Sequence, residues 1–254
     1  MFFFFFVVVA VLLFGVLCLT AFMAFQVRHS NHSAKIKPKR EKASLCAVLG
    51  SGGHTTEMLD LIKHFGDEFD ERTYIIADTD TISEEKVRDI MSVLCPIVLL
   101  FKAVAHEKSR NNEKFCIERI PRSREVGQSY ITSIASTFHA TVFAVKLIYR
   151  IRPDLVLLNG PGTCIPVALA AAFFDIIRLH DTVIIYEESI CRVRKLSLSG
   201  AILYYLGMVD CLIVQWPGLK KLYPRATYIH DLEFKPTSAS ESNSPITSDD
   251  KKSI

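Results

Sequence analysis

The stretch that decides the fold lies at residues 45–65 and reads LCAVLGSGGHTTEMLDLIKHF. Its first five residues, Leu45–Leu49, form an uninterrupted apolar run that ends at a glycine-rich turn. After the turn, apolar side chains recur at helical spacing, at Met58, Leu59, Ile62 and Phe65. This pattern predicts a strand that is buried on both faces, a tight turn and a helix.

The same alternation of strand and helix recurs along the chain. The expected further strands are Tyr74–Ala77, Ile97–Phe101, Asp154–Leu158, Thr182–Tyr186 and Cys211–Val214, with Phe115–Ile120 as a possible additional one. The expected helices are Ser83–Val93, Tyr130–Arg150, an alanine-rich segment from Thr163 to near Leu179, Leu198–Leu206 and a short helix capped by Trp216-Pro217-Gly218. This order predicts an α/β fold with a doubly wound, Rossmann-like parallel sheet.

Composition and length favour one folded domain. The chain has 254 residues, of which 50% are hydrophobic and 22% charged, and its net charge is only +3. These values exclude a disordered chain and argue against a protein whose main partner is nucleic acid. We expect the domain at residues 45–234, after a basic linker at 27–44 and before a disordered tail at 235–254.

Residues 1–26 are expected to form a membrane anchor. From Phe2 to Phe25 there is no charged residue, and a helix of that length would span roughly 36 Å, against about 30 Å of bilayer hydrocarbon. A cleaved signal peptide fits less well, because nothing basic precedes the run and the run is too long. Basic residues follow the run, so the positive-inside rule predicts a luminal N-terminus and a cytosolic folded domain.

The seven cysteines are scattered, odd in number and without a C-x-x-C pair. Such usage argues against a disulfide framework and against a zinc site, and it agrees with a reducing, cytosolic environment. We expect the protein to bind neither a metal nor another cofactor.

Three segments carry the candidate chemistry, because each follows an expected strand and ligands bind beyond the carboxyl ends of parallel strands. They are Gly50–Glu57, Asn159–Thr163 and Glu187–Ser189. The glycines of the first segment would let backbone N–H groups and the positive helix end approach a phosphate or diphosphate. His54 is either a general base or a capping and packing residue, and the helix dipole alone would explain Glu57 in the first helical turn. The alternative for the two glycine-bearing segments is a simple turn that binds no ligand. The alternative for Glu187–Ser189 is a charged strand end that is solvated or held in salt bridges.

The glycine-rich turn is open to a second interpretation, as the G-x-G-x-x-G fingerprint of a dinucleotide-binding site with Asp78 as its acidic residue. A membrane-tethered dinucleotide-dependent oxidoreductase is therefore an alternative function. Thr55 stands where the third glycine belongs, and no Tyr-x-x-x-Lys pair is present, which weighs against this alternative. A scaffold with an inactive cleft is a third possibility.

Five segments, in this order, resemble one protein family. They are Leu49–Met58, Ile120–Ser129, Asn159–Thr163, Glu188–Val193 and Val214–Pro217. The family is the membrane-anchoring subunit of the two-subunit UDP-N-acetylglucosamine transferase of dolichol-linked oligosaccharide synthesis. The resemblance covers essentially Met1 to Tyr223, and departures from the family pattern are concentrated after Tyr223.

The resemblance implies the N-terminal lobe of a GT-B glycosyltransferase, similar to the bacterial transferase that builds the peptidoglycan lipid intermediate. The other lobe, with most of the UDP-sugar site, would be a soluble catalytic subunit that this chain recruits to the cytosolic face of the endoplasmic reticulum. The pair would add the second N-acetylglucosamine to GlcNAc-diphospho-dolichol, and this chain alone would be inactive. The length agrees with this division, because it leaves room for one lobe.

The resemblance also suggests site residues. His54 would be the base that activates the acceptor hydroxyl, and Glu188 is a second catalytic candidate. The residues expected to hold the acceptor or its diphosphate are Gly50, Ser51, Gly52, Gly53, Thr55, Asn159, Gly160, Gly162, Thr163 and Glu187. The residues expected to dock the partner are Trp216, Pro217, Leu219, Leu222 and Tyr223.

The expected helix Tyr130–Arg150 has a broad apolar face. The face contains Ile131, Ile134, Phe138, Val142, Val145 and Ile148. We expect it to pack in the core, and contact with the bilayer near the lipid acceptor is the alternative.

Overall fold

The structure, a computed structural model, describes residues 42–65, 69–90, 115–124, 127–160 and 162–232. The expected membrane anchor, nearly all of the basic linker, the expected strand Ile97–Phe101 and the expected disordered tail lie outside these residues. Within them, strands and helices alternate along the chain.

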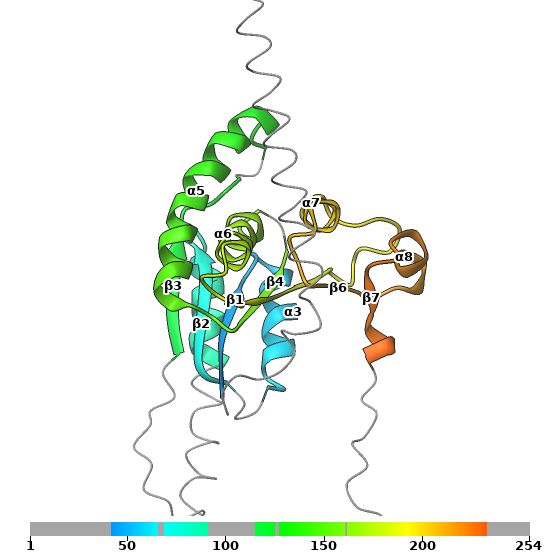
Figure 1. The fold of residues 1–254 in the computed structure, drawn as a ribbon, viewed down its shortest axis with the longest axis horizontal. Coiled ribbons are helices and arrows are strands. Elements are labelled where there is room, and N and C mark those ends of the chain that lie inside the picture. Colours follow the sequence, from blue (N-terminus) through cyan, green and yellow to red (C-terminus); the bar gives the residue numbers. More distant parts are fainter. Residues whose placement is uncertain (1–41, 66–68, 91–114, 125–126, 161, 233–254) are drawn as a thin grey trace, which may run out of the picture.

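The strands form one sheet in which all paired neighbours are parallel. They are β1 Ala43–Val48, β2 Phe69–Ala77, β3 Phe115–Ile120, β4 Leu155–Asn159, β5 Val183–Glu187, β6 Cys211–Val214 and β7 Thr227–Tyr228. Their order across the sheet is β3-β2-β1-β4-β5-β6-β7 (Figure 1). The predicted doubly wound parallel sheet is confirmed, and the possible strand Phe115–Ile120 is present. The prediction that Cys211–Val214 is the last strand was wrong, because β7 extends the sheet and is too short to give an apolar pattern.

The helices connect the strands. They are α3 Gly53–Ile62, α5 Tyr130–Ile151, α6 Cys164–Ile176, α7 Leu198–Leu206 and α8 Pro217–Leu222, with a 3₁₀ turn at Ile229–Leu232 and a further helix at residues 81–90. Because these helices join parallel strands, their N-termini lie at the carboxyl edge of the sheet. Ser129 and Ser197 cap α5 and α7, since each hydroxyl accepts a hydrogen bond from a backbone N–H of the first turn.

The core lies on both faces of the sheet. Along β1, Cys46 and Val48 pack in one cluster with residues of α5, α6 and α7, while Leu45 and Ala47 pack in a second cluster with α3 and Val87. Successive side chains of a strand point to opposite faces, so a strand covered on both faces is apolar at every position. This arrangement explains the uninterrupted run with which β1 begins the fold.

The expectation that the apolar face of α5 packs in the core was wrong for the N-terminal half of that helix. Ile134, Phe138 and Val142 are exposed, whereas Ala140 and Ala144 are fully buried. α5 packs along the alanine-rich α6, and small side chains let two helices approach closely. In this half of α5, the residues that pack against α6 are therefore not those with the largest apolar side chains.

Candidate functional site

Two glycines make room for the side chain of His54 at the start of α3. A Cβ atom at Gly50 would lie 2.9 Å from the Cβ of His54, and one at Gly160 would lie 2.9 Å from its Cγ. Both separations are well below the optimum distance between carbon atoms. Gly160 also has a φ of 98°, where the absence of a side chain is an advantage. The imidazole is thus held between the carboxyl ends of β1 and β4.

The imidazole of His54 belongs to a polar network. Its Nδ1 lies 2.9 Å from Oδ1 of Asn159, the last residue of β4. The amide nitrogen of Asn159 donates to Glu57 at 3.3 Å, and the hydroxyl of Ser189 donates to the other carboxylate oxygen of Glu57 at 2.9 Å. A carboxylate only accepts, so Glu57 turns the oxygen of Asn159 toward His54. His54 must then donate from Nδ1, which leaves Nε2 of the neutral imidazole as an acceptor.

Glu57 has a different role from the one that the sequence suggested. The sequence suggested that Glu57 lies in the first turn of the helix, where the helix dipole alone would favour a carboxylate. In the structure, α3 has no acidic residue in its first turn. Its carboxylate instead joins the residues that follow β4 and β5. The predicted meeting of the three segments at the carboxyl edge is confirmed, because side chains from all three are in hydrogen-bond contact.

The two carboxylates after Tyr186 lie in different surroundings. One oxygen of Glu187 accepts a hydrogen bond from Gln215 at 2.8 Å, and the other is buried without a partner among the described residues. Burial raises the pKa of Glu187, and the nearby charge of Glu57 raises it further. Glu188 is 1% exposed and accepts hydrogen bonds from the backbone N–H and the hydroxyl of Ser197, at 2.8 and 3.0 Å. These contacts hold the loop before α7, and the catalytic role suggested for Glu188 stays a prediction.

Thr55 removes the basis of the dinucleotide interpretation. Its buried hydroxyl donates to the carbonyl of Gly50 and lies 2.6 Å from the hydroxyl of Ser83. The side chain therefore ties the turn to the helix at residues 81–90, at the position where a dinucleotide fingerprint requires glycine for close packing. Nothing in this arrangement supports the alternative oxidoreductase.

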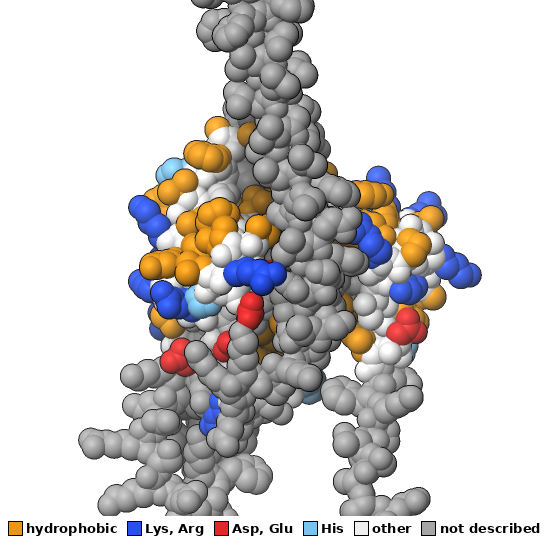
Figure 2. All heavy atoms as spheres, viewed as in Figure 1, with side chains coloured by type: hydrophobic (Ala, Val, Ile, Leu, Met, Phe, Trp, Pro, Cys, Tyr) orange, Lys and Arg blue, Asp and Glu red, His pale blue; other side chains and the backbone are white. Residues whose placement is uncertain are grey.

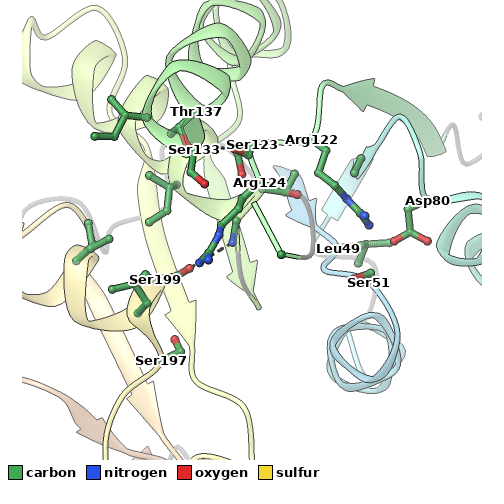
Figure 3. Close-up of a pocket in the computed structure, with 18 of the residues that line it drawn as sticks. Leu49, Ser51, Asp80, Arg122, Ser123, Arg124, Ser133, Thr137, Ser197 and Ser199 are labelled. Atoms are coloured by element: carbon green, nitrogen blue, oxygen red, sulfur yellow. Dashed lines mark hydrogen bonds between the residues drawn. The ribbon is translucent and has the colours of Figure 1, made fainter. Parts of the chain in front are cut away.

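A cavity of about 700 Å³ lies at the same edge of the sheet, bordered by α5, α6 and α7 (Figure 3). Three of the predicted binding residues, Ser51, Gly162 and Thr163, line it. The remaining predicted binding residues and His54 are not among the lining residues, although Ser51 is only three positions before His54. The cavity and the His54 network are therefore neighbours that share one turn.

Arginines dominate the charge of the cavity. Arg122 and Arg124 follow β3, Arg192 follows β5, and Asp80 is the acidic residue of the lining. The carboxylate of Asp80 accepts hydrogen bonds from the backbone N–H and the hydroxyl of Ser83, at 3.1 and 2.7 Å. Figure 3 shows Arg122 on the side of Leu49 and Arg124 extending toward Ser199. One guanidinium group can donate two parallel hydrogen bonds to the oxygens of a phosphate. The lining is therefore suited to a phosphate or diphosphate.

Helix N-termini and apolar side chains complete the lining. The N-terminal turns of α5, α6 and α7 contribute Ser133, Ile165 and Ser199. A helix N-terminus attracts anions through its free N–H groups and its dipole. The apolar part of the wall consists of Ile134, Ile165, Leu198 and Ile202, together with Leu49 and Ala77. The cavity therefore fits a ligand that has both an anionic group and an apolar part.

The five residues expected to dock a partner are not equivalent. Trp216 and Pro217 are exposed, and the indole N–H of Trp216 donates to the carbonyl of Ile190 at 2.7 Å. Leu222 is 64% exposed, whereas Leu219 is fully buried, and Tyr223 packs edge-on against Tyr204. Only the exposed members of this set can contact another protein directly, and Leu219 supports α8 from inside the domain.

Residues 45–232 match the family described as "Oligosaccharide biosynthesis protein Alg14 like". The chain belongs to this family. The resemblance inferred from the sequence is thereby confirmed. The matched region of this Alg14-like chain includes the His54 network, the cavity and α8.

Relatives of this Alg14-family chain carry one name. The human protein named "UDP-N-acetylglucosamine transferase subunit ALG14" is 43% identical over 190 residues, which are 75% of this chain and 83% of the human protein. The Yarrowia lipolytica protein of the same name is 38% identical over 193 residues, which are 76% of this chain and 82% of that protein. Among solved structures, the chain resembles MurG of Acinetobacter baumannii at 15% identity and a TM-score of 0.45. That match covers 69% of this chain and 42% of MurG, so the chain spans less than half of that structure.

Proposed function

We propose that this chain is the membrane-anchoring and acceptor-side subunit of a UDP-N-acetylglucosamine transferase at the cytosolic face of the endoplasmic reticulum. A soluble catalytic subunit would supply the UDP-sugar site. The pair would add the second N-acetylglucosamine to GlcNAc-diphospho-dolichol. The shared name of the relatives supports a transferase subunit, and the uncharged run Phe2–Phe25 supports an anchor.

The chemistry of the cavity carries the proposal. Its three arginines and its helix N-termini suit a diphosphate, and its apolar wall suits the first isoprene units of a lipid. A lipid-linked acceptor presents these two groups side by side. With the diphosphate between Arg122, Arg124 and Arg192, the acceptor sugar would extend past Ser51 toward His54.

His54 would then act as the general base. Asn159 holds the proton on Nδ1, so Nε2 can take the proton of the acceptor hydroxyl. The hydroxyl oxygen forms a bond to the anomeric carbon of the donor sugar as the bond between that carbon and UDP breaks. Of the other predicted binding residues, Gly50 and Gly160 act by seating His54, and Glu187 lies close enough to Glu57 for the two charges to interact.

A transfer assay tests the proposal. Membranes that contain the full chain would be incubated with UDP-GlcNAc and a GlcNAc-diphospho-lipid, with and without the soluble subunit. We expect the di-N-acetylglucosaminyl lipid only when both proteins are present. Transfer by the chain alone, or no transfer by a complex that has formed, would overturn the proposal. An inactive scaffold predicts instead that substitution of His54 leaves transfer intact.

A further inference from the structure

Exposed apolar side chains continue outward from the cavity wall. Ile134 on α5 and Ile202 on α7 both line the cavity. Ile134 is 71% exposed, and Phe138, one turn further along α5, is 72% exposed. Tyr205 follows Ile202 on α7 and is 69% exposed. We call these four residues, together with the exposed Leu198, the apolar rim.

The apolar rim is part of a wider surface on one side of the domain. Figure 2 shows hydrophobic side chains gathered over α5 and α6. Other exposed members on the three helices, or directly after α6, are Val142, Phe143, Phe173, Ile177, Leu179 and Leu206. Apolar surface of this extent marks an interaction site, because soluble domains rarely leave so much of it in water.

The packing of α5 decides how this surface can meet a membrane. By length and composition, Thr132–Ile151 could cross a bilayer, and it is the one such helix in the part of the chain that the structure describes. However, Ala144, Leu147 and Ile148 belong to the buried core, and α5 lies along α6. A helix that keeps these contacts cannot span a membrane, but its free face can lie in the headgroup region.

The charged residues on the same side of the domain favour binding to an anionic membrane surface. α5 contains Lys146 and Arg150 and no acidic residue, although Arg150 pairs with Glu118 at 2.8 Å. Residues 190–206 contain no acidic residue and three basic ones, of which Arg192 lines the cavity. On the opposite face of the sheet, α3 and the helix at 81–90 carry five acidic side chains, at Glu57, Asp60, Glu84, Glu85 and Asp89, against two basic ones, at Lys86 and Arg88. The two faces therefore differ in both apolar exposure and charge.

We infer that the apolar rim rests in the headgroup region of the bilayer, with Arg194 and Lys195 against anionic lipids. This contact is additional to the predicted N-terminal anchor, and it requires neither a sugar donor nor a partner subunit. It places the mouth of the cavity at the membrane. A lipid-linked ligand then enters the cavity without leaving the bilayer, a consequence that rests on the proposed function.

Tryptophan fluorescence tests the contact in the full chain. The chain contains one tryptophan, Trp216, so Trp216→Phe gives a background without tryptophan. In this background, Phe138→Trp reports on α5 and Ile202→Trp reports on α7. Asp60→Trp is the matched control, because Asp60 is exposed on α3 at the opposite face. Each variant is reconstituted into phosphatidylcholine–phosphatidylserine vesicles, with or without lipids brominated near the headgroup.

We expect brominated lipid to lower the fluorescence of Phe138→Trp and Ile202→Trp about twofold, since an interfacial helix face is buried roughly 5–10 Å into the boundary region. The fluorescence of Asp60→Trp should change little, and thermal unfolding should show that all three variants are folded. Equal quenching at all three positions would overturn the inference. So would blue-shifted but unquenched emission at residues 138 and 202, because protein would then cover the apolar rim. The assay contains no donor sugar and no partner, so its outcome is independent of the transfer assay.

Discussion

The Nδ1 nitrogen of His54 lies 2.9 Å from the side-chain oxygen of Asn159, although 105 positions separate the two residues in the chain. The Asn159 amide is itself oriented by Glu57, which also accepts a hydrogen bond from Ser189. Three strand ends thus fix the tautomer of one imidazole. This arrangement is what a general base requires, because the unprotonated Nε2 must be available when the acceptor hydroxyl arrives.

Substitutions of His54 and Asn159 should affect catalysis rather than assembly with the partner subunit. In the reconstituted complex, we expect His54→Ala to lower kcat by about 10²–10⁴-fold, the usual contribution of general base catalysis. Asn159→Asp places a carboxylate beside the imidazole and favours the protonated form of the imidazole. The pH at which kcat rises should therefore be about one unit higher than in the wild type. The measurement is the pH profile of kcat, with the KM for each substrate determined in parallel.

His64→Ala is the control for this pair, because His64 is exposed just beyond the end of α3. It should leave the profile unchanged. If Asn159→Asp lowers kcat equally at every pH, Asn159 supports only the fold, and the assignment of its role in positioning His54 is wrong.

The arginines of the cavity should determine affinity for the lipid acceptor. We expect Arg122→Ala, Arg124→Ala and Arg192→Ala each to raise the KM for the acceptor about tenfold or more, the scale of a lost charge-assisted hydrogen bond. The KM for UDP-GlcNAc should change little, because the proposed function assigns most of the donor site to the other subunit. Arg88→Ala is the control, since Arg88 is exposed and pairs with Glu84 away from the cavity. An equal rise for donor and acceptor would show that the cavity does not select the acceptor.

Much of the fold was predictable because strands buried on both faces leave continuous apolar runs. Tyr130–Arg150 was predicted within one residue of α5 Tyr130–Ile151, and Leu198–Leu206 coincides with α7. The packing of α5 was not predictable from its apolar residues. Ala140 and Ala144 carry little hydrophobicity, yet their small size decides which face meets α6. In the N-terminal half of α5, the face with the larger side chains remained free.

The candidate site was predictable only in part. Glycine turns after strands located Gly50, Asn159 and Gly160 correctly at the carboxyl edge, but a sequence does not show which side chains turn toward a cavity. Arg122 and Arg124 lie in the segment Ile120–Ser129, which entered the prediction only through the family resemblance, although they directly follow an expected strand, where ligands bind in a parallel sheet. Glu187 and Glu188 are adjacent in sequence, and only the structure shows that Glu188 is engaged by Ser197.

Glu187 should make the stability of the domain depend on pH. Burial, and then the charge of Glu57, raise the pKa of Glu187 in the folded state. The folded state therefore binds this proton more tightly than the unfolded state, so the contribution is present below the unfolded-state pKa and is lost as the pH rises through the folded-state pKa. We expect Glu187→Gln to raise the Tm near pH 8 by about 2–4 °C, the scale of 1 kcal/mol in a domain of this size, and to change it little near pH 4.

Thermal unfolding of the detergent-solubilised chain at both pH values measures this difference. Glu85→Gln is the control, because Glu85 is exposed on the helix at 81–90. A lower Tm for Glu187→Gln at the higher pH would mean that the charged carboxylate stabilises the fold through Gln215, contrary to the expectation.

The exposed residues of α8 should determine whether the soluble subunit binds. Leu222 and Ile82 are each 64% exposed, but Leu222 lies on α8 and Ile82 on the helix at 81–90, near the other end of the sheet. A charge in an apolar contact remains desolvated and unpaired, so we expect Leu222→Asp to abolish co-purification of the partner, while Ile82→Asp retains it. Because both side chains are largely in solvent, neither variant should lower the Tm of the chain. Leu219→Asp would not be informative, since Leu219 is fully buried and its loss would unfold α8. If Leu222→Asp keeps the partner and Ile82→Asp loses it, the docking surface lies beside β2 rather than beside β6 and β7.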